Sequence, residues 1–285
     1  MEVKNPDYST GDVDGIGKHW KKRYTLFSKF DQGIIIDSRE SWYSVTPESI
    51  AKSHAQHCRD MLYLSKIPSY LGPMYKNSNV CLDAFCGVGG NAIQFAKTCD
   101  KVVAIDIDPI KIDAAKNNAK IYGVENKIEF IVGDFFQVAP SIKADVVFLS
   151  PPWGGPKYKD VESFDIQNMN LDGIKVFDIA KNITENICYY LPKNTNTKQL
   201  VSLSRNGRVD IKYETIRHPF VVALTAYYGN LCSSPQHTIP HQWPRLTADA
   251  YHFSFLNNKK QSVQITVNKG GKMRRKSPSR AKIVI

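Results

Sequence analysis

The sequence predicts a doubly wound α/β domain with an antiparallel hairpin at the end of its sheet and a small helical extension on its N-terminal side. Three observations support this prediction. From residue 79 onward, short apolar runs alternate with helical patterns, which is typical of parallel sheets covered by helices. A glycine-rich turn follows the first of these runs. Acidic residues stand at or just after the ends of the first three predicted strands.

Before this alternation the chain carries a separate helical segment. Residues 18–45 mix basic and aromatic side chains. Thr46 as the N-cap and Pro47 at the first helical position predict the start of a helix, which we expect to run to about residue 63 or 64. Two prolines and a glycine between residues 68 and 73 then predict a loop.

The elements of the α/β domain follow from the apolar runs and their boundaries. Gly123 ends one helix, because glycine readily adopts the left-handed conformation that closes a helix. The His218-Pro219 pair marks the turn of the hairpin. The predicted strands are 80–84, 101–105, 127–132, 144–149 and 187–191, the predicted helices are 91–97, 109–122 and 172–184, and the predicted hairpin strands are 209–215 and 220–228.

These patterns divide the chain into four segments. Residues 1–17 are rich in glycine and aspartate, and we expect them to be disordered. Residues 18–75 form an N-terminal extension that we expect to cover the site as a lid. Residues 76–232 form the α/β domain, and residues 233–285 form a basic tail that we expect to be partly disordered.

The positive charge of the chain is concentrated in this tail. The formal net charge is +11, and residues 233–285 hold ten Lys and Arg residues against one acid, Asp249, so they contribute +9 of it. The α/β domain and its extension are therefore nearly neutral. Two interpretations of the tail stay open: contact with RNA backbone or nuclear import on one side, and a solvated tail without a dedicated partner on the other.

Composition also argues against several classes of protein. No apolar run is long enough to span a bilayer, and the first residues lack the apolar stretch of a signal peptide. The six cysteines form no C-x-x-C pair, which favours a reduced intracellular protein without a metal site. His54 and His57 have no further ligands nearby in the sequence, so we expect surface histidines. We expect Cys86 to be a packing residue, since no base accompanies it.

The most informative stretch is residues 150–156, Ser-Pro-Pro-Trp-Gly-Gly-Pro, which follows an apolar run over 146–149. Each proline fixes its own backbone angle and forces the preceding residue to be extended, so the turn is stiff. Some of its carbonyl groups are then free to face a cleft, beside the flat face of the tryptophan. Such a site can hold a planar ring with an exocyclic amine and orient the nitrogen for methylation.

Carboxylates at three successive strand ends predict the other side of that cleft. Asp83 begins the glycine-rich turn 83–91, Asp106 closes the second strand, and Asp134 follows the third. Asp83 can bind an ammonium group, Asp106 can accept hydrogen bonds from two ribose hydroxyls, and Asp134 with Phe135 can contact an adenine. The turn lacks the G-x-G-x-x-G spacing of dinucleotide sites. These acids therefore favour S-adenosylmethionine, which is a cation that carries a ribose and an ammonium group.

These motifs together resemble those of the trimethylguanosine synthases, which convert the 7-methylguanosine cap of small nuclear and nucleolar RNAs to the 2,2,7-trimethyl form. The glycine-rich turn 83–91 and the turn 150–156 carry the resemblance. The blocks 42–48, 191–194 and 225–229 extend it over most of residues 18–231. The resemblance implies the Rossmann-like fold of class I S-adenosylmethionine-dependent methyltransferases.

The resemblance also implies roles for individual residues. Trp153 would stack on the 7-methylguanine, whose positive charge over an indole face is worth about 0.5–2 kcal/mol. Ser150 would place the amine, and Lys18 with Lys193 would hold the cap triphosphate. The family carries arginine where Lys193 stands, and lysine keeps the charge but loses the bidentate fork. The expected catalytic residues are Ser150, Pro151 and Trp153; the expected cofactor residues are Asp83, Phe85, Gly87, Gly89, Asn91, Asp106, Asp108, Asp134, Phe135 and Ser150; the expected cap residues are Lys18, Phe27, Thr46, Pro47, Trp153, Lys193 and Asn194.

Purely structural roles for these residues stay open as alternatives. Trp153 could be a core tryptophan, Phe27 could make a simple core contact, and either lysine could be a solvated surface charge. The acids could be ordinary helix caps. The structure can decide how each side chain is packed.

The expected activity is two N2 methylations of the cap guanine by direct in-line transfer from the sulfonium. The expected partners are capped small nuclear or nucleolar RNA and ribonucleoprotein proteins, with no membrane and no metal. The expected location is the nucleus, in the nucleolus or a Cajal-body-like structure, and also the cytoplasm. Two alternatives remain: a methyltransferase acting on another exocyclic amine, such as adenine N6 or a protein amide, and a non-catalytic cap-binding or RNA-binding module.

Overall fold

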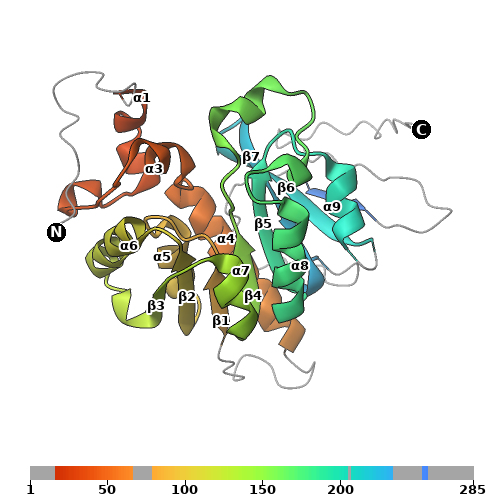
Figure 1. Ribbon diagram of the computed structural model, residues 1–285, viewed down its shortest axis with the longest axis horizontal. Helices are drawn as coiled ribbons and strands as arrows, with labels where there is room; N and C mark the ends of the chain where they lie inside the picture. Colours follow the sequence, from red (N-terminus) through yellow and green to blue (C-terminus); the bar gives the residue numbers. More distant parts are fainter. Residues whose placement is uncertain (1–16, 67–78, 205–206, 234–251, 256–285) are drawn as a thin grey trace, which may run out of the picture.

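A computed structural model describes residues 17–66, 79–204, 207–233 and 252–255 of the chain (Figure 1). The disorder predicted for residues 1–17 lies outside the described residues except for Gly17. Most of the tail 233–285 also lies outside them. Within the described part, none of the helices is long and apolar enough to cross a membrane.

In the part of the chain that the structure describes, one sheet of eight strands has the order β3-β2-β1-β4-β5-β7-β6-β8. The five strands from β3 to β5 are parallel, and β7, β6 and β8 continue the sheet antiparallel to their neighbours. This order confirms the predicted doubly wound sheet with its terminal hairpin. The strands are β1 Val80–Asp83, β2 Lys101–Asp106, β3 Ile128–Val132, β4 Val146–Leu149, β5 Ile187–Pro192, β6 Val209–Arg217, β7 Phe220–Tyr227 and β8 His252–Phe255.

Helices cover both faces of the sheet, and alternate strand residues contribute to the two apolar layers between them (Figure 1). On β1, Cys81 packs into the layer with α4, α5 and α6, whereas Leu82 packs into the layer with α7, α8 and α9. These helices are α4 Glu48–Lys66, α5 Gly90–Ala96, α6 Pro109–Tyr122, α7 Phe135–Val138, α8 Gly173–Ile183 and α9 Thr197–Leu203.

The N-terminal extension is part of the same core. Its short helices are α1 Gly17–Trp20, α2 Arg23–Leu26 and α3 Arg39–Ser44. Trp42 of α3 is 1% exposed and packs at 5.7 Å from Phe30. The Asn118 side chain of α6 exchanges two hydrogen bonds with the backbone of Ile35, each 2.8 Å long. A buried amide that satisfies an extended segment in this way fixes the extension against the domain.

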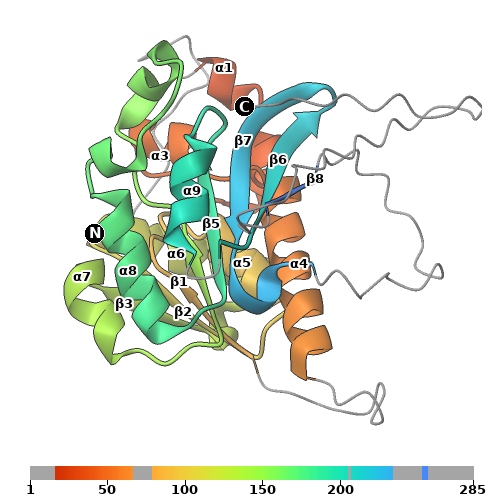
Figure 2. The same cartoon turned by 90° about the vertical axis from the view of Figure 1, so that its right-hand side faces the viewer.

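Helix α4 corrects two predictions. It begins at Glu48, and the carbonyl of Pro47 accepts the hydrogen bond from Ala51 N, so the predicted N-cap at Thr46 is one residue too early. His54 is not a surface residue: its side chain is completely buried. The reason is that α4 packs against α5 on one side and lies beside β6 on another (Figure 2). The face that carries His54 is therefore enclosed.

The remaining structural expectations concern cysteines and metals. All six cysteines are free and buried in the structure. Among the described residues, no group of three or more His, Cys, Asp or Glu side chains is placed to hold a metal ion.

Candidate active site

A cavity of about 440 Å³ opens at the carboxyl ends of β1, β2 and β4, where ligands bind in open α/β sheets. The glycine-rich turn and the residues after β2, β3 and β4 form its floor and sides. Part of α3 and the segment before α4 form one wall. The lining residues are Glu40, Ser41, Ser44, Val45, Thr46, Asp83, Ala84, Phe85, Cys86, Gly87, Val88, Gly90, Asn91, Asp106, Ile107, Asp108, Lys111, Gly133, Asp134, Phe135, Phe136, Ser150, Pro152, Asn170 and Leu171.

Asp83 is the most unusual group in this cavity. It ends β1 and is completely buried, and the backbone amides of Phe85 and Ala92 are the hydrogen-bonding groups beside its carboxylate. Burial raises the pKa of Asp83 to about 7, and the nearby Asp106 adds to the rise. A buried, ionised carboxylate that is not paired with a cation is strongly unfavourable. A cation bound in the cavity would relieve this penalty, so Asp83 fits the ammonium group of S-adenosylmethionine.

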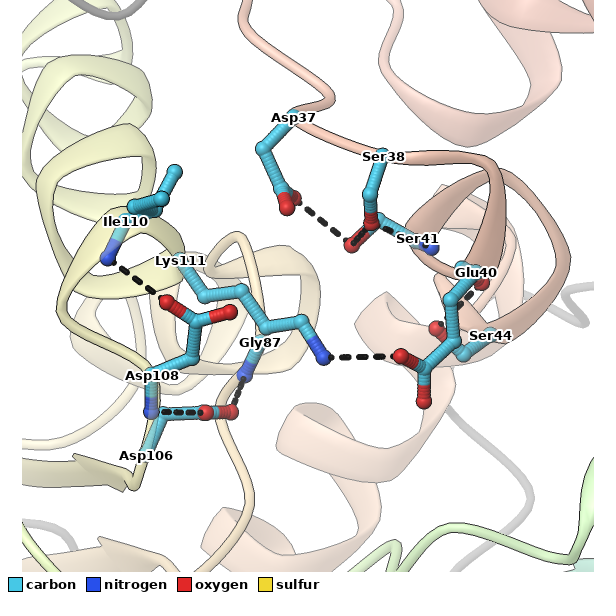
Figure 3. Close-up of polar contacts among 10 residues, drawn as sticks. All are labelled: Asp37, Ser38, Glu40, Ser41, Ser44, Gly87, Asp106, Asp108, Ile110 and Lys111. Atoms are coloured by element: carbon cyan, nitrogen blue, oxygen red, sulfur yellow. Dashed lines mark hydrogen bonds and ion pairs between the residues drawn. The ribbon is translucent and has the colours of Figure 1, made fainter.

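Asp106 holds the glycine-rich turn in place (Figure 3). One oxygen of its carboxylate accepts a hydrogen bond from Gly87 N at 2.9 Å, and the other accepts from Asp108 N at 3.0 Å. Burial raises the pKa of Asp106 above its ordinary value. Because each oxygen retains a free lone pair, the carboxylate can still accept bonds from ribose hydroxyls.

Two glycines give the turn its shape. Gly87 has a φ of 51° and Gly89 a φ of 90°, conformations that other residues adopt with strain. A side chain at Gly89 would also come within 3.3 Å of the Cβ of Ala115. Gly89 does not line the cavity, and its predicted role in cofactor binding stays a prediction.

Two further acids are helix caps as well as lining residues. Asp108 accepts a hydrogen bond from Ile110 N at 2.8 Å at the start of α6, and Asp134 accepts one from Phe136 N at 2.9 Å at the start of α7. One oxygen of each carboxylate therefore acts as an ordinary helix cap. Both residues also line the cavity, and their predicted contacts with the cofactor stay predictions.

Aromatic rings form an apolar part of the cavity near Asp134. The rings of Phe85 and Phe135 lie 5.0 Å apart, and Phe136 lies 5.6 Å from Phe135. All three residues line the cavity. An apolar wall beside a carboxylate is the environment that an adenine with its attached ribose requires.

The N-terminal extension contributes residues that the sequence did not single out. Ser38 caps α3 and accepts a hydrogen bond from Ser41 N, while the Ser41 hydroxyl donates to Asp37 at 2.7 Å (Figure 3). Glu40 on the same helix faces Lys111 of α6. The only sequence signal for this wall was the resemblance of block 42–48. Glu40, Ser41 and Lys111 have no motif of their own.

The turn 150–156 lies between the cavity and an aromatic cluster. Ser150 and Pro152 line the cavity, and the Ser150 hydroxyl donates to the carbonyl of Phe85 at 3.4 Å. Pro151 is buried. Trp153 stands just outside the lining, with its ring 5.3 Å from Tyr158 and 5.4 Å from Tyr190.

Trp153 is half-buried rather than fully exposed. It packs against both apolar layers of the domain. Part of the Trp153 side chain therefore packs as a core tryptophan would. Its predicted stacking on a base is not tested by this packing and stays a prediction.

The predicted cap residues are dispersed around this cluster. Thr46 lines the cavity, whereas Pro47 does not. Phe27 is 1% exposed and packs near Tyr122, which is the core contact left open above. Lys193 is exposed, as a solvated charge would be. The side chain of Lys18 lies outside what the structure describes.

The Asn194 side chain hydrogen-bonds two backbone carbonyls. Its amide nitrogen donates to the carbonyl of Tyr158 at 2.9 Å and to that of Val161 at 2.8 Å. These bonds tie the end of β5 to the chain that follows Trp153. A direct contact between this nitrogen and a cap would require at least one of them to break.

Cys86 lines the cavity in an environment that disfavours the thiolate form. Its thiol is buried, and burial, together with Asp83 and Asp106, raises its pKa well above the ordinary value. A thiol that retains its proton reacts slowly. The packing role expected for Cys86 agrees with this environment.

Comparison with known proteins adds an independent line of evidence. The model of a family described as RNA cap guanine-N2 methyltransferase matches residues 78–231. Trimethylguanosine synthase of Schizosaccharomyces pombe is 40% identical over 192 residues, covering 65% of this chain and 74% of that protein. Trimethylguanosine synthase of Saccharomyces cerevisiae is 34% identical over 195 residues, covering 66% of this chain and 58% of that protein.

A solved structure supports the fold alone. A protein from Porphyromonas gingivalis, described as a methyltransferase, superposes with a TM-score of 0.57 at 15% identity. The superposition covers 84% of this chain and 55% of that one.

Proposed function

This chain belongs to the RNA cap guanine-N2 methyltransferase family, and we propose that it converts the 7-methylguanosine cap of RNA to the 2,2,7-trimethyl form by two successive N2 methylations. It is an S-adenosylmethionine-dependent enzyme, and family membership implies that it binds capped RNA. The two similar yeast proteins named trimethylguanosine synthase support the doubly methylated product.

One observation supports the proposed site more than any other. The turn 150–156 connects the proposed cofactor site with the proposed site for the cap base. Ser150 and Pro152 line the cavity, while Trp153, the next residue, stands outside it among aromatic rings. A base stacked on Trp153 would therefore project its exocyclic amine toward the cavity, across the two prolines.

The cavity offers a suitable group for each part of the methyl donor. Asp83 would hold the ammonium group, since no cationic side chain among the described residues compensates its buried carboxylate. Asp106 would accept the ribose hydroxyls. Phe85 and Phe135 would enclose the adenine, and Asp134 would contact its amine.

Alignment is the main chemical task of these residues. When bound, S-adenosylmethionine supplies a methyl group that is already activated by the sulfonium. The cofactor would supply this methyl group to the guanine N2 lone pair, the electrons of the broken carbon–sulfur bond would stay on sulfur, and the amine would release one proton to solvent. The Ser150 hydroxyl and carbonyl groups of the turn would accept hydrogen bonds from the amine and orient its lone pair. Proximity and orientation of this kind account for much of an enzyme's rate acceleration.

We propose small nuclear and nucleolar RNAs as the substrates, ribonucleoprotein proteins as partners, and the nucleus, with the nucleolus or a Cajal-body-like structure, as the place of action, with some activity also in the cytoplasm. The resemblance of the sequence motifs supports the choice of RNA. The basic composition of residues 233–285 is compatible with nuclear import or with contact to the RNA backbone.

A transfer assay tests the proposed activity. Purified protein is given labelled S-adenosylmethionine and dinucleotides capped with 7-methylguanosine or with unmethylated guanosine. We expect two methyl groups to be transferred to N2 of the 7-methylated cap and almost none to the unmethylated one. A product with one methyl group only would restrict the proposal to monomethylation.

Other outcomes would support the alternatives. Equal transfer to both caps would remove the role of the cationic base on Trp153. Transfer to adenine N6 or to a protein amide, but not to the cap, would indicate a different amine substrate. Cap binding without any transfer would indicate a non-catalytic module.

A further inference from the structure

Behind the cavity lies a buried polar chain that the reaction described so far does not use. His54 of α4 is completely enclosed, with its ring 5.3 Å from Phe148 and 5.2 Å from Tyr190. Its Nδ1 atom lies 3.1 Å from the amide nitrogen of Asn91, and its Nε2 atom lies 2.8 Å from the hydroxyl of Thr225. A buried imidazole with both nitrogens engaged has one fixed orientation.

The far end of this chain is a buried ion pair on the hairpin. The Thr225 hydroxyl donates to Glu214 at 2.9 Å, and the Lys212 ammonium lies 3.1 Å from the same carboxylate. Lys212 also donates to the Ser53 hydroxyl at 2.6 Å. Burial alone would raise the pKa of Glu214, but a hydrogen bond with His54 and the charge of Lys212 lower it, so Glu214 is ionised and an acceptor only.

With a neutral His54 ring, these constraints determine the direction of every bond. Because Glu214 can only accept, Thr225 donates to it and must accept from His54 Nε2. The proton of the neutral ring therefore lies on Nε2, and Nδ1 accepts from the Asn91 amide. Burial lowers the pKa of His54 below its ordinary value, although Glu214 acts in the opposite sense, which agrees with a neutral ring.

Asn91 is the residue that connects this chain to the cavity. It belongs to the first turn of α5, it is 5% exposed, and it lines the cavity together with Asp83. An amide side chain can present either its nitrogen or its oxygen after a half-turn. With the nitrogen bonded to His54, the oxygen is the atom left for the cavity.

We propose that His54 is a positioning residue for the methyl donor: it holds the Asn91 amide so that an acceptor oxygen, and not an NH₂ group, faces the ammonium end of the bound cofactor beside Asp83. In the opposite orientation, two N–H dipoles would point at a cation. The inference rests on cofactor binding and not on the proposed trimethylated product, so a binding assay without cap separates the two.

Substitutions at His54 distinguish positioning from packing. Asparagine places an oxygen close to where Nδ1 stands, so His54→Asn keeps an acceptor for Asn91. Glutamine reaches to the place of Nε2, so His54→Gln keeps the bond with Thr225 instead. His54→Leu keeps neither. We expect His54→Asn to bind S-adenosylhomocysteine within about threefold of wild type, and the other two variants to bind at least tenfold more weakly.

A ligand without an ammonium group provides a second test of positioning against packing. 5′-Methylthioadenosine has the adenosine part of the cofactor but no ammonium group. Calorimetric titration should show that His54→Gln and His54→Leu bind this compound as wild type does. In an Asn91→Ala background, His54→Leu should have no further effect on S-adenosylhomocysteine affinity, as expected for residues that act together.

A neighbouring histidine provides the matched control. His57 lies one turn further along α4, its Nε2 is 2.8 Å from the carbonyl of Leu231, and its ring packs 4.0 Å from Tyr227. His57→Asn should lower the melting temperature without changing S-adenosylhomocysteine affinity. The proposal is overturned if the three His54 variants lose affinity in proportion to their loss of melting temperature, if both ligands are affected equally, or if affinity does not change.

Discussion

The ammonium group of Lys111 on α6 lies 3.4 Å from the carboxylate of Glu40 on α3, so an ion pair joins the N-terminal extension to the helix that follows Asp106 (Figure 3). Both residues line the cavity. Burial works against the charge of Lys111, but Glu40 and Asp106 raise its pKa above the ordinary value. The pair therefore connects the wall made by α3 with the acidic floor of the cavity.

Breaking this pair should loosen the wall. In Glu40→Gln we expect S-adenosylhomocysteine to dissociate about two to five times faster, since Glu40 is 66% exposed and such pairs are worth at most about 1 kcal/mol. Stopped-flow displacement measures the rate. Raising the salt concentration should accelerate release from wild type more than from the variant.

A second pair on the same helix serves as the control. Lys116 lies 3.6 Å from Asp113, away from the cavity lining. Asp113→Asn should leave the dissociation rate unchanged. Identical rates for Glu40→Gln and wild type would show that α3 does not retain the ligand.

The buried carboxylate of Asp83 should make the stability of the ligand-free protein depend on pH. Its pKa is about 7 in the folded protein, against an ordinary 3.8. Between these values the folded state binds more protons than the unfolded state, so the free energy of unfolding falls as pH rises. We expect wild type to lose about 2 kcal/mol between pH 5 and 7 relative to Asp83→Asn. Urea unfolding at both pH values measures this, and parallel curves would contradict it.

Ligand binding should depend on pH in the opposite sense. An ammonium group favours the ionised form of Asp83, so S-adenosylhomocysteine affinity should rise as pH increases toward about 7 and level off above it. Titration calorimetry at pH 6 in buffers of different ionisation enthalpy should detect a proton released on binding. Asp83→Asn should bind at least about tenfold more weakly, without that release. A release that persists in the variant would have to come from another group.

Much of the fold could be predicted from the sequence because its signals are local. The helix Pro109–Tyr122 has an acid as N-cap, proline at its first position and glycine after its end, and its predicted bounds match the observed ones. The carboxylates at strand ends could be predicted for a similar reason. In a parallel sheet, the ends of β1 and β2 lie side by side whatever the loops do.

What could not be predicted depends on tertiary packing. His54 has the sequence context of a surface residue, and its burial follows only from the position of α4 between α5 and the hairpin. Asn194 resembled a ligand residue, yet its amide is used by carbonyls more than thirty residues away in the chain. Glu40 and Lys111 meet only because the extension folds back over α6.

The aromatic cluster around Trp153 should discriminate between methylated and unmethylated caps. Trp153→Phe keeps an apolar ring against Tyr158 and Tyr190 but offers a weaker cation site than an indole. We expect the 7-methylguanosine cap to bind about three to ten times more weakly, with little change for a guanosine cap and none for S-adenosylhomocysteine. Fluorescence titration measures the first two. An equal loss for both caps would mean that Trp153 contributes only apolar contact.

The two neighbouring residues Lys193 and Asn194 should affect cap binding by different physical routes. Asn194→Leu removes the donor that bonds Tyr158 and Val161 without adding a charge, so two carbonyls lose their partner and the segment after Trp153 is loosened. Two lost hydrogen bonds are worth about 1–3 kcal/mol, so we expect the Michaelis constant for capped dinucleotide to rise about tenfold at any salt concentration.

Lys193→Ala removes an exposed charge instead. Its effect should shrink as salt increases, because screening already weakens an exposed charge acting on a triphosphate. It should also disappear with 7-methylguanosine that lacks the phosphates, whereas the effect of Asn194→Leu should remain. Neither variant should change S-adenosylhomocysteine affinity. If salt suppressed both effects equally, Asn194 would act on the phosphates and not through the segment that carries Trp153.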